Sequence, residues 1–204
     1  TFATNYPNCT KISGYLTIGG TPQKPSDIHN LRGLGALTSI GGYLSIVDTD
    51  DLRSLRGLEA ITSVQGLVII RTGGLSDFRG LDALTSVWGD DMVNDTEDLK
   101  SLSGLEALRD LNGLAGLSRI GGLEIFSNDV LRSLSGLGAL TVFRGGSLII
   151  KDNRTLRDLS GLDGISSVGS EWAPGDLRIE HNESLRSLRG LNALTSVDGE
   201  NVIN

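Results

Sequence analysis

Leucine and other aliphatic residues recur at every third position over long stretches of the chain. The run from Leu52 to Val64 returns almost unchanged from Leu185 to Val197. A spacing of three fits neither the α-helix nor the strand, but it aligns side chains in one row in extended or 3₁₀-like turns. We therefore predict that these leucines point into a shared core.

Each leucine run closes on an apolar residue, and aligning these residues reveals an internal repeat. The closing residues are Ile12, Ile40, Val64, Val87, Ile120, Phe143, Val168 and Val197. Most intervals are 23 to 25 residues, and three longer ones predict insertions at 20–27, 107–114 and 170–175. The middle insertion continues the leucine rhythm and has room for a helical turn. The repeats predict one solenoid domain over residues 1–204.

A short alternating segment follows each leucine run, after one or two glycines. The clearest segments are 15–18, 43–46, 148–150 and 177–179. Alternation is the period of a β-strand, so the leucines and isoleucines of these segments are expected to face inward. One unit is too small to bury its own apolar side chains, whereas stacked units bury them between layers. The sequence thus predicts a mainly β protein, a parallel β-helix (solenoid) of about eight leucine-rich layers with short turns or 3₁₀ segments.

An apolar patch is predicted on the outward face of the strands. Its expected members are Tyr15, Tyr43, Leu67, Ile69 and Met92, which the alignment places on adjacent layers. Exposed apolar patches mark contacts with other molecules. The alternative is that a loop or a glycan covers the patch.

The two ends of the solenoid form a second candidate contact. The first layer offers Ile12, Leu16 and Ile18, and the last layer offers Val202 and Ile203. A solenoid without polar caps leaves strand edges open, which predicts head-to-tail stacking into a filament. The alternative is a longer protein that continues with a further layer.

Composition narrows the possible partners. The chain carries 18 basic and 25 acidic side chains, a formal net charge of −7, so no nucleic-acid partner is expected. No apolar run approaches the roughly 20 residues of a membrane-spanning helix, so no transmembrane segment is expected.

Candidate catalytic and metal-binding residues are sparse. His29 and His181 do not lie at metal-ligand spacing from each other or from Cys9, and each is expected in a solvated loop. Five acidic residues fall within residues 90–98, which fits a solvated turn better than a calcium loop. No nucleophile elbow or phosphate-binding loop occurs. We therefore expect no enzyme activity, metal or cofactor.

An asparagine stands three residues after the inward isoleucine in several layers, at Asn128, Asn153 and Asn182. This resembles the asparagine position of leucine-rich repeats, where the side chain satisfies backbone groups of a turn. In other layers the position is taken by Thr21, Thr49, Gly73 and Thr96. A partial ladder of polar side chains is the expected result.

The opening of the chain, residues 8–18 (NCTKISGYLTI), is similar to the start of a receptor L domain of the insulin and epidermal growth factor receptor families. Residues 177–185 resemble a later turn of such a domain, and the rhythm is similar over nearly the whole chain. The resemblance implies a right-handed β-helix, secretion, and protein or glycan binding rather than catalysis.

Modification of the chain follows from the extracellular location that the resemblance implies. Of four glycosylation sequons, those at Asn8 and Asn94 are predicted to carry N-linked glycans. The sequons at Asn153 and Asn182 coincide with the inward ladder position and are less accessible. Cys9, the single cysteine, is a free thiol buried as a small hydrophobic residue, half of an interchain disulfide near the filament junction, or bonded to a group outside this sequence.

Two functions from different classes remain open. The first is a non-enzymatic extracellular structural glycoprotein whose solenoid assembles end to end with itself into a fibre or surface layer. The alternative is a recognition ectodomain of a receptor or adhesin, which binds a protein or a glycan on its strand face.

Overall fold

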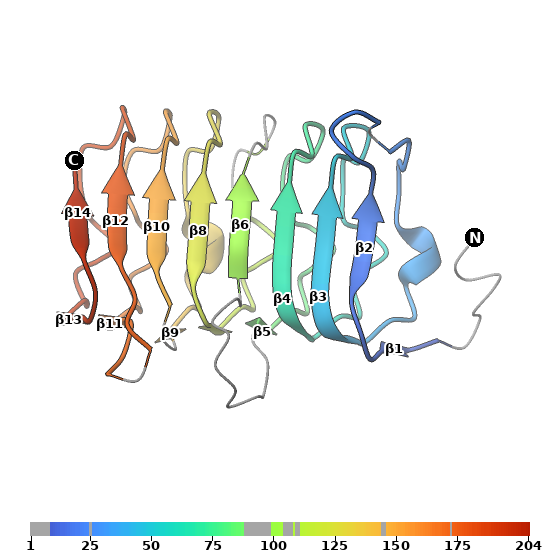
Figure 1. Ribbon diagram of the computed structural model, residues 1–204, viewed down its shortest axis with the longest axis horizontal. Coiled ribbons are helices and arrows are strands. Elements are labelled where there is room, and N and C mark those ends of the chain that lie inside the picture. The colour runs from blue at the N-terminus through green and yellow to red at the C-terminus, as the bar shows by residue number, and fades with distance from the viewer. Residues whose placement is uncertain are drawn as a thin grey trace.

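The chain winds into a parallel β-solenoid in which each long strand stacks on the long strand of the next layer (Figure 1). This computed structural model describes residues 9–24, 26–87, 99–103, 108, 111–143, 146–171 and 173–204, with the backbone alone for 99–103. The long strands are β2 (Leu16–Gly19), β3 (Ser39–Val47), β4 (Ser63–Ile70), β6 (Leu99–Ser103), β8 (Leu123–Phe126), β10 (Leu148–Lys151), β12 (Leu177–Glu180) and β14 (Asn201–Ile203). They form the strand face, and the predicted fold class is confirmed.

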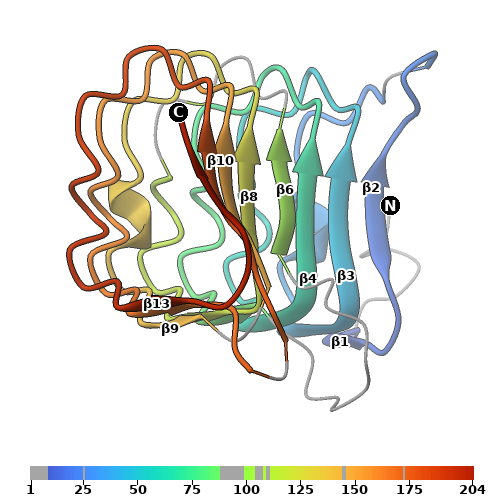
Figure 2. The ribbon, with the colours of Figure 1, turned by 60° about the vertical axis from the view of Figure 1, so that its left-hand side comes forward.

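A second row of short strands runs along an adjacent side of the solenoid (Figure 2). It consists of β1 (Lys11–Ile12), the first residues of β3 and β4, β5 (Ser86–Val87), β7 (Arg119–Ile120), β9 (Val142–Phe143), β11 (Ser167–Val168) and β13 (Ser196–Val197). The closing residues pair here in register in two groups, from Ile12 to Phe143 and from Val168 to Val197; Ile40, for example, lies opposite both Ile12 and Val64. The alignment of the repeats is therefore confirmed in three dimensions.

The remaining side of each layer is a chain of tight turns that carries the leucine row. Backbone bonds span three residues, as from the Leu37 N–H to the Leu34 carbonyl at 2.9 Å and from the Leu34 N–H to the Leu31 carbonyl at 2.9 Å. Two turns are regular enough to count as 3₁₀ helices, η1 (Arg32–Leu34) and η2 (Ser135–Leu137). The row is buried as predicted, with Leu55 and Leu134 fully inaccessible to solvent.

Glycine is needed where the turns of adjacent layers meet. Gly57 has φ of 114° and Gly161 has φ of 114°, a left-handed conformation that other residues adopt at a cost. A Cβ on Gly57 would collide with the Leu31 carbonyl of the layer before, and one on Gly161 with the Leu134 carbonyl. This explains the recurrent glycine within the leucine runs.

Two of the three predicted insertions are confirmed as loops, and the third was placed wrongly. The loop at 20–27 and the loop at 170–175 each contain a small antiparallel bridge. In the predicted insertion at 107–114, however, the leucines at 108, 111 and 114 are fully buried in the inward row. Since β6 begins only at Leu99, twelve positions after Val87, the extra residues of this long repeat precede its strand.

Candidate functional site

The amino-terminal part of the strand face presents no charged side chain. The register of β2, β3 and β4 arranges their outward residues, together with Tyr15 just before β2, in three columns across the three strands. The nine residues are Tyr15, Thr17, Gly19, Tyr43, Ser45, Val47, Gly66, Val68 and Ile70. Charged residues make up 21% of the chain, so nine adjacent outward positions without one are a local departure from its composition. We call these nine residues the uncharged patch.

Two tyrosines form the most prominent feature of the uncharged patch. The rings of Tyr15 and Tyr43 are stacked, with centroids 6.0 Å apart and planes inclined by 25°. Tyr15 is nonetheless 73% exposed. Gly42 makes room for its ring, because a Cβ there would lie 2.8 Å from the Tyr15 Cδ1 atom. The tyrosine ring is thus held against the backbone of the next layer and displayed to solvent.

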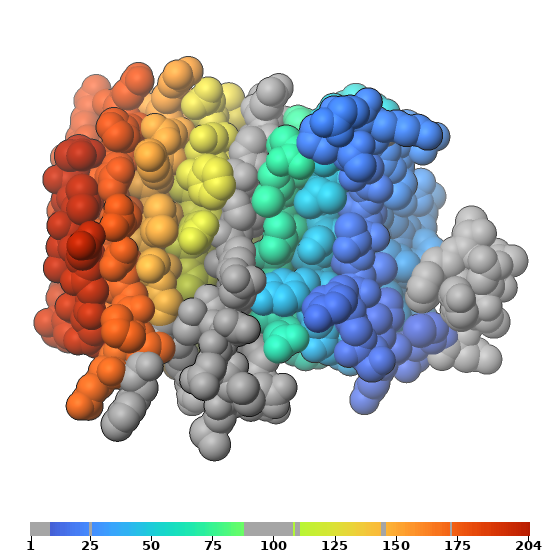
Figure 3. All heavy atoms as spheres, viewed as in Figure 1, coloured from blue at the N-terminus to red at the C-terminus, as the bar shows by residue number. Residues whose placement is uncertain are grey.

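The carboxy-terminal part of the strand face is charged, and its charges face one another. Its outward acidic and basic residues are Glu124, Lys151, Asp176, Arg178, Glu180 and Glu200. The Arg178 guanidinium lies 3.2 Å from Asp176 and 3.0 Å from Glu200, and the Lys151 ammonium lies 4.0 Å from Glu180. Figure 3 shows the strand face coloured by residue number, so that the uncharged patch falls on the blue, cyan and green segments and the charged part on the yellow to red segments.

The predicted apolar patch is wrong for two of its five members. Leu67 and Ile69 are fully buried, and Val68 and Ile70 face outward in their place. A one-residue change of phase turns every side chain of a strand to the other face. The error arose because β3 contains one more residue than β4 between two successive pairs. Ile40 pairs with Val64 and Tyr43 with Gly66, so the register shifts between them.

Met92, the fifth predicted member of the patch, lies outside the described residues. The long strand that pairs with β4 and β8 in this layer is β6.

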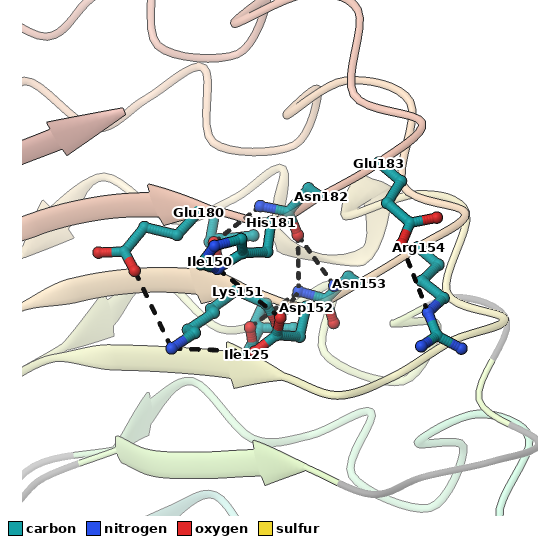
Figure 4. A network of polar contacts seen from close by, with 10 residues as sticks. All are labelled: Ile125, Ile150, Lys151, Asp152, Asn153, Arg154, Glu180, His181, Asn182 and Glu183. Carbon is teal, nitrogen blue, oxygen red and sulfur yellow. Dashed lines mark hydrogen bonds and ion pairs between the residues drawn. The ribbon is translucent and has the colours of Figure 1, made fainter. Parts of the chain in front are cut away.

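A ladder of buried asparagines runs just past the carboxyl ends of β8, β10 and β12, and Figure 4 shows Asn153 and Asn182. The Asn153 N–H and Nδ2 donate to the Oδ1 of Asn182 at 3.0 and 3.2 Å, and Asn153 Oδ1 accepts from the Asn128 N–H at 3.2 Å. Asn153 Nδ2 also donates to the Ile125 carbonyl at 2.9 Å, and Asn182 Nδ2 to the Ile150 carbonyl at 2.8 Å. The predicted ladder is confirmed for these three layers.

In the second and third layers, threonines occupy the position that asparagine holds in the carboxy-terminal layers. Thr49 and Thr72 are fully buried, and their hydroxyls have no hydrogen-bond partner in the structure. The ladder position of this layer is Thr72 and not Gly73 as predicted, because Ile69 rather than Ile70 faces inward. Thr21 is exposed and pairs through its backbone with Lys24, so it is not a rung, and Thr96 lies outside the described residues.

The residue before each ladder position turns the chain with a positive φ. These residues are Asp48, Arg71, Ser127, Asp152 and His181, with φ between 51° and 56°. Asp48 and Arg71 form a two-pronged ion pair across adjacent layers, at 2.7 and 2.9 Å. The hydrogen bonds from Arg71 lower the pKa of the Asp48 carboxyl, whose side chain is only 6% exposed.

The other predicted site residues lie apart from the uncharged patch. Asn153 and Asn182 are buried as expected, whereas Asn8 and Asn94 lie outside the described residues. The Cys9 thiol is partly buried, 3.4 Å from the Lys11 carbonyl.

The two histidines are solvated as predicted. The His29 and His181 side chains are 67% and 62% exposed, each within 4 Å of one aspartate. Within the part of the chain that the structure describes, no three histidine, cysteine or acidic side chains gather to hold a metal ion.

Among the residues predicted to form the end-to-end junction, Ile18 is buried in the core beside Ile46. It is therefore not available for contact with another chain. Ile12, Leu16 and Val202 are partly buried, and Ile203 is 51% exposed. No described helix has the length and apolarity to cross a membrane.

Fold and surface together define a leucine-rich parallel β-solenoid with an open strand face. Residues 8–68 match the receptor L domain family, so the resemblance read from the opening residues is confirmed over the first three layers. Receptor L domains are non-catalytic, ligand-binding domains, which favours ligand recognition and gives no support to a fibre-forming role. No curated protein and no solved structure matches the chain.

Proposed function

We propose that this protein is a ligand-recognition module of the receptor L domain type, which binds its ligand on the uncharged patch. The observation that carries the proposal is the run of nine outward positions without a charge on β2 to β4. Contact surfaces are depleted of charged residues at their centre and enriched in tyrosine. The segment that matches the receptor L domain, residues 8–68, includes all of these positions except Ile70.

The charged part of the strand face fits this role less well. Its arginine and lysine are already within 4 Å of acidic side chains of the same face. A ligand that covered them would have to replace water around paired charges, and this desolvation offsets the gain from contact. The charged part is therefore assigned to solubility and lies outside the proposed contact.

The proposal includes an extracellular location, a non-catalytic role and N-linked glycans on Asn8 and Asn94. The family match supports the first two, since receptor L domains are typically parts of ectodomains. Glycopeptide mass spectrometry on protein from the native source tests the third. An unmodified Asn8 in that material would count against secretion.

Site-specific photo-crosslinking tests the position of the contact. A photoreactive side chain replaces Ser45 in one preparation and Ile149 in another; both residues face outward in the same column of the sheet. After incubation with extracellular material of the native source, adducts are expected from position 45 and not from position 149. Equal adducts from both positions, or adducts from 149 alone, would contradict the assignment.

A further inference from the structure

We propose that the ligand of the uncharged patch is a neutral glycan, bound by stacking of a sugar ring on Tyr15. This inference rests on the proposed function and narrows it. It follows from three properties of the patch: a displayed aromatic ring, neighbouring hydroxyl groups, and the lack of charge.

The aromatic ring is displayed and held in place. Tyr15 is 73% exposed although its ring stacks on Tyr43 and lies over Gly42. The face of an aromatic ring is electron-rich, and the C–H bonds on one side of a pyranose ring are weakly positive, so the two pack face to face. Because the stacking partner and the backbone already restrain Tyr15, binding costs little side-chain entropy.

Hydroxyl groups adjoin the ring at the spacing of the sheet. Thr17 follows Tyr15 by two residues on the same face, and Ser45 lies opposite Thr17 on β3. Adjacent rungs are about 4.8 Å apart and alternate residues roughly 7 Å apart. Hydroxyls at these distances from a stacked sugar ring reach its own hydroxyl groups, and each can donate as well as accept.

The absence of charge selects among glycans. Sulfated or uronic-acid chains are recognised by arginine and lysine, which pair with their acidic groups. None of the nine residues of the uncharged patch is basic. An acidic glycan on this surface would leave its own sulfate or carboxylate groups without a basic partner, whereas a neutral glycan has no such groups.

The dimensions of the patch favour a glycan over a protein. Three strands of about five residues present roughly 200 Å², from the standard strand and rung spacings. A stable protein interface buries about 800 Å² on each partner. A protein partner would therefore have to extend over the ion-paired part of the strand face, whereas a few sugar rings fit within the patch.

Saturation-transfer NMR on the full chain tests the proposal, with neutral β-linked hexasaccharides of glucose, mannose and galactose as the probes. At least one is expected to bind, with transfer to C–H protons of one ring face, and Tyr15→Ala should weaken it at least tenfold. Phe126→Ala is the matched control, an outward aromatic residue on β8 in the charged part, and should leave binding unchanged. Gly42→Ala, which displaces the Tyr15 ring, should weaken binding without removing any group that touches sugar.

The outcomes separate this inference from the proposed function. If no neutral hexasaccharide binds, but crosslinking from position 45 still yields a protein adduct, the glycan is excluded and the patch remains a contact site. If neither experiment gives a signal, both proposals fail. Equal losses for Tyr15→Ala and Phe126→Ala, or binding only of a hyaluronan hexasaccharide used as an acidic control, would also overturn the glycan assignment. The Tyr15→Ala chain is expected to keep its melting temperature, because this residue is exposed. That control shows that a loss of binding is not due to unfolding.

Discussion

The amino-terminal layers around β2 to β4 and the carboxy-terminal layers around β8 to β12 share one backbone but differ in their polar groups. Both bury leucines in the same inward row. The carboxy-terminal layers have an asparagine ladder and ion pairs on the strand face, whereas the amino-terminal layers have buried threonines and an uncharged strand face, with their ion pair, Asp48–Arg71, in the turns. The inward row therefore determines the fold, and the polar positions are free to serve stability in one region and contact in the other.

The comparison predicts first that the core is equivalent in the two regions. Leu55→Ala and Leu134→Ala each remove a fully buried side chain and should each lower the free energy of unfolding by about 2–5 kcal/mol. Urea denaturation followed by circular dichroism measures both. The control is Ser45→Ala on the outer face, which should cost little. A loss below about 1 kcal/mol at either leucine would show that the two cores are not equivalent.

The ladder should matter most where it is made of asparagine. Asn153→Ala removes the acceptor of the Asn128 N–H and a donor to the Ile125 carbonyl, both in the buried interior. Each buried polar group left without a partner costs about 1–3 kcal/mol, so a loss of at least about 2 kcal/mol is expected in urea titrations. If the variant is as stable as the unsubstituted chain, the ladder has no stabilising role.

Acid should weaken the amino-terminal region through the Asp48–Arg71 pair. Hydrogen bonds from Arg71 lower the pKa of Asp48 in the folded state. The pair therefore contributes its full stability above the unfolded pKa of about 3.9, and this contribution is lost as the pH falls through the lowered folded value. The melting temperature of Asp48→Asn should lie below that of the unsubstituted chain at pH 7, and the difference should shrink towards pH 2. A difference that is constant with pH would contradict the ion pair.

The smallest effect is expected at the threonine rungs. The Thr72 hydroxyl is buried without a hydrogen-bond partner, so Thr72→Val keeps the shape and removes a desolvated polar group. The free energy of unfolding should stay the same or rise by up to about 1 kcal/mol. A loss comparable to that of Asn153→Ala would mean that the two parts of the ladder work alike.

The inward row was predictable because a spacing of three residues between leucines fits only turns in which all of these side chains face the same side. The closing residues, such as Ile40 and Val64, occur at fixed places in nearly identical runs and pair as aligned. The asparagine rungs were equally predictable from the sequence. Each of Asn128, Asn153 and Asn182 follows an inward isoleucine by three residues.

The outer face was harder to predict because alternation has two phases. Val68, Ile69 and Ile70 are all apolar, so the segment does not reveal which side faces the core. Only the pairing with β3 decides it, and the register shift before Tyr43 is a tertiary feature. The strand of the fourth layer was missed because β6 begins at Leu99, twelve positions after Val87, a longer interval than the other layers have before their long strands. Of the candidate site, Tyr15 and Tyr43 were found from the sequence, whereas the outward direction of Val68 and Ile70 required the structure.

The most direct test of the uncharged patch is to place one charge in each half of the strand face. Ser45→Glu and Ile149→Glu introduce the same carboxylate in the same outward column, and neither position is in the core. Binding of each purified variant to extracellular matrix from the native source is measured by biolayer interferometry. Ser45→Glu should weaken binding at least tenfold, and Ile149→Glu should leave it within twofold of the unsubstituted chain. Equal affinities of the two variants would contradict the assignment of ligand recognition to the uncharged patch.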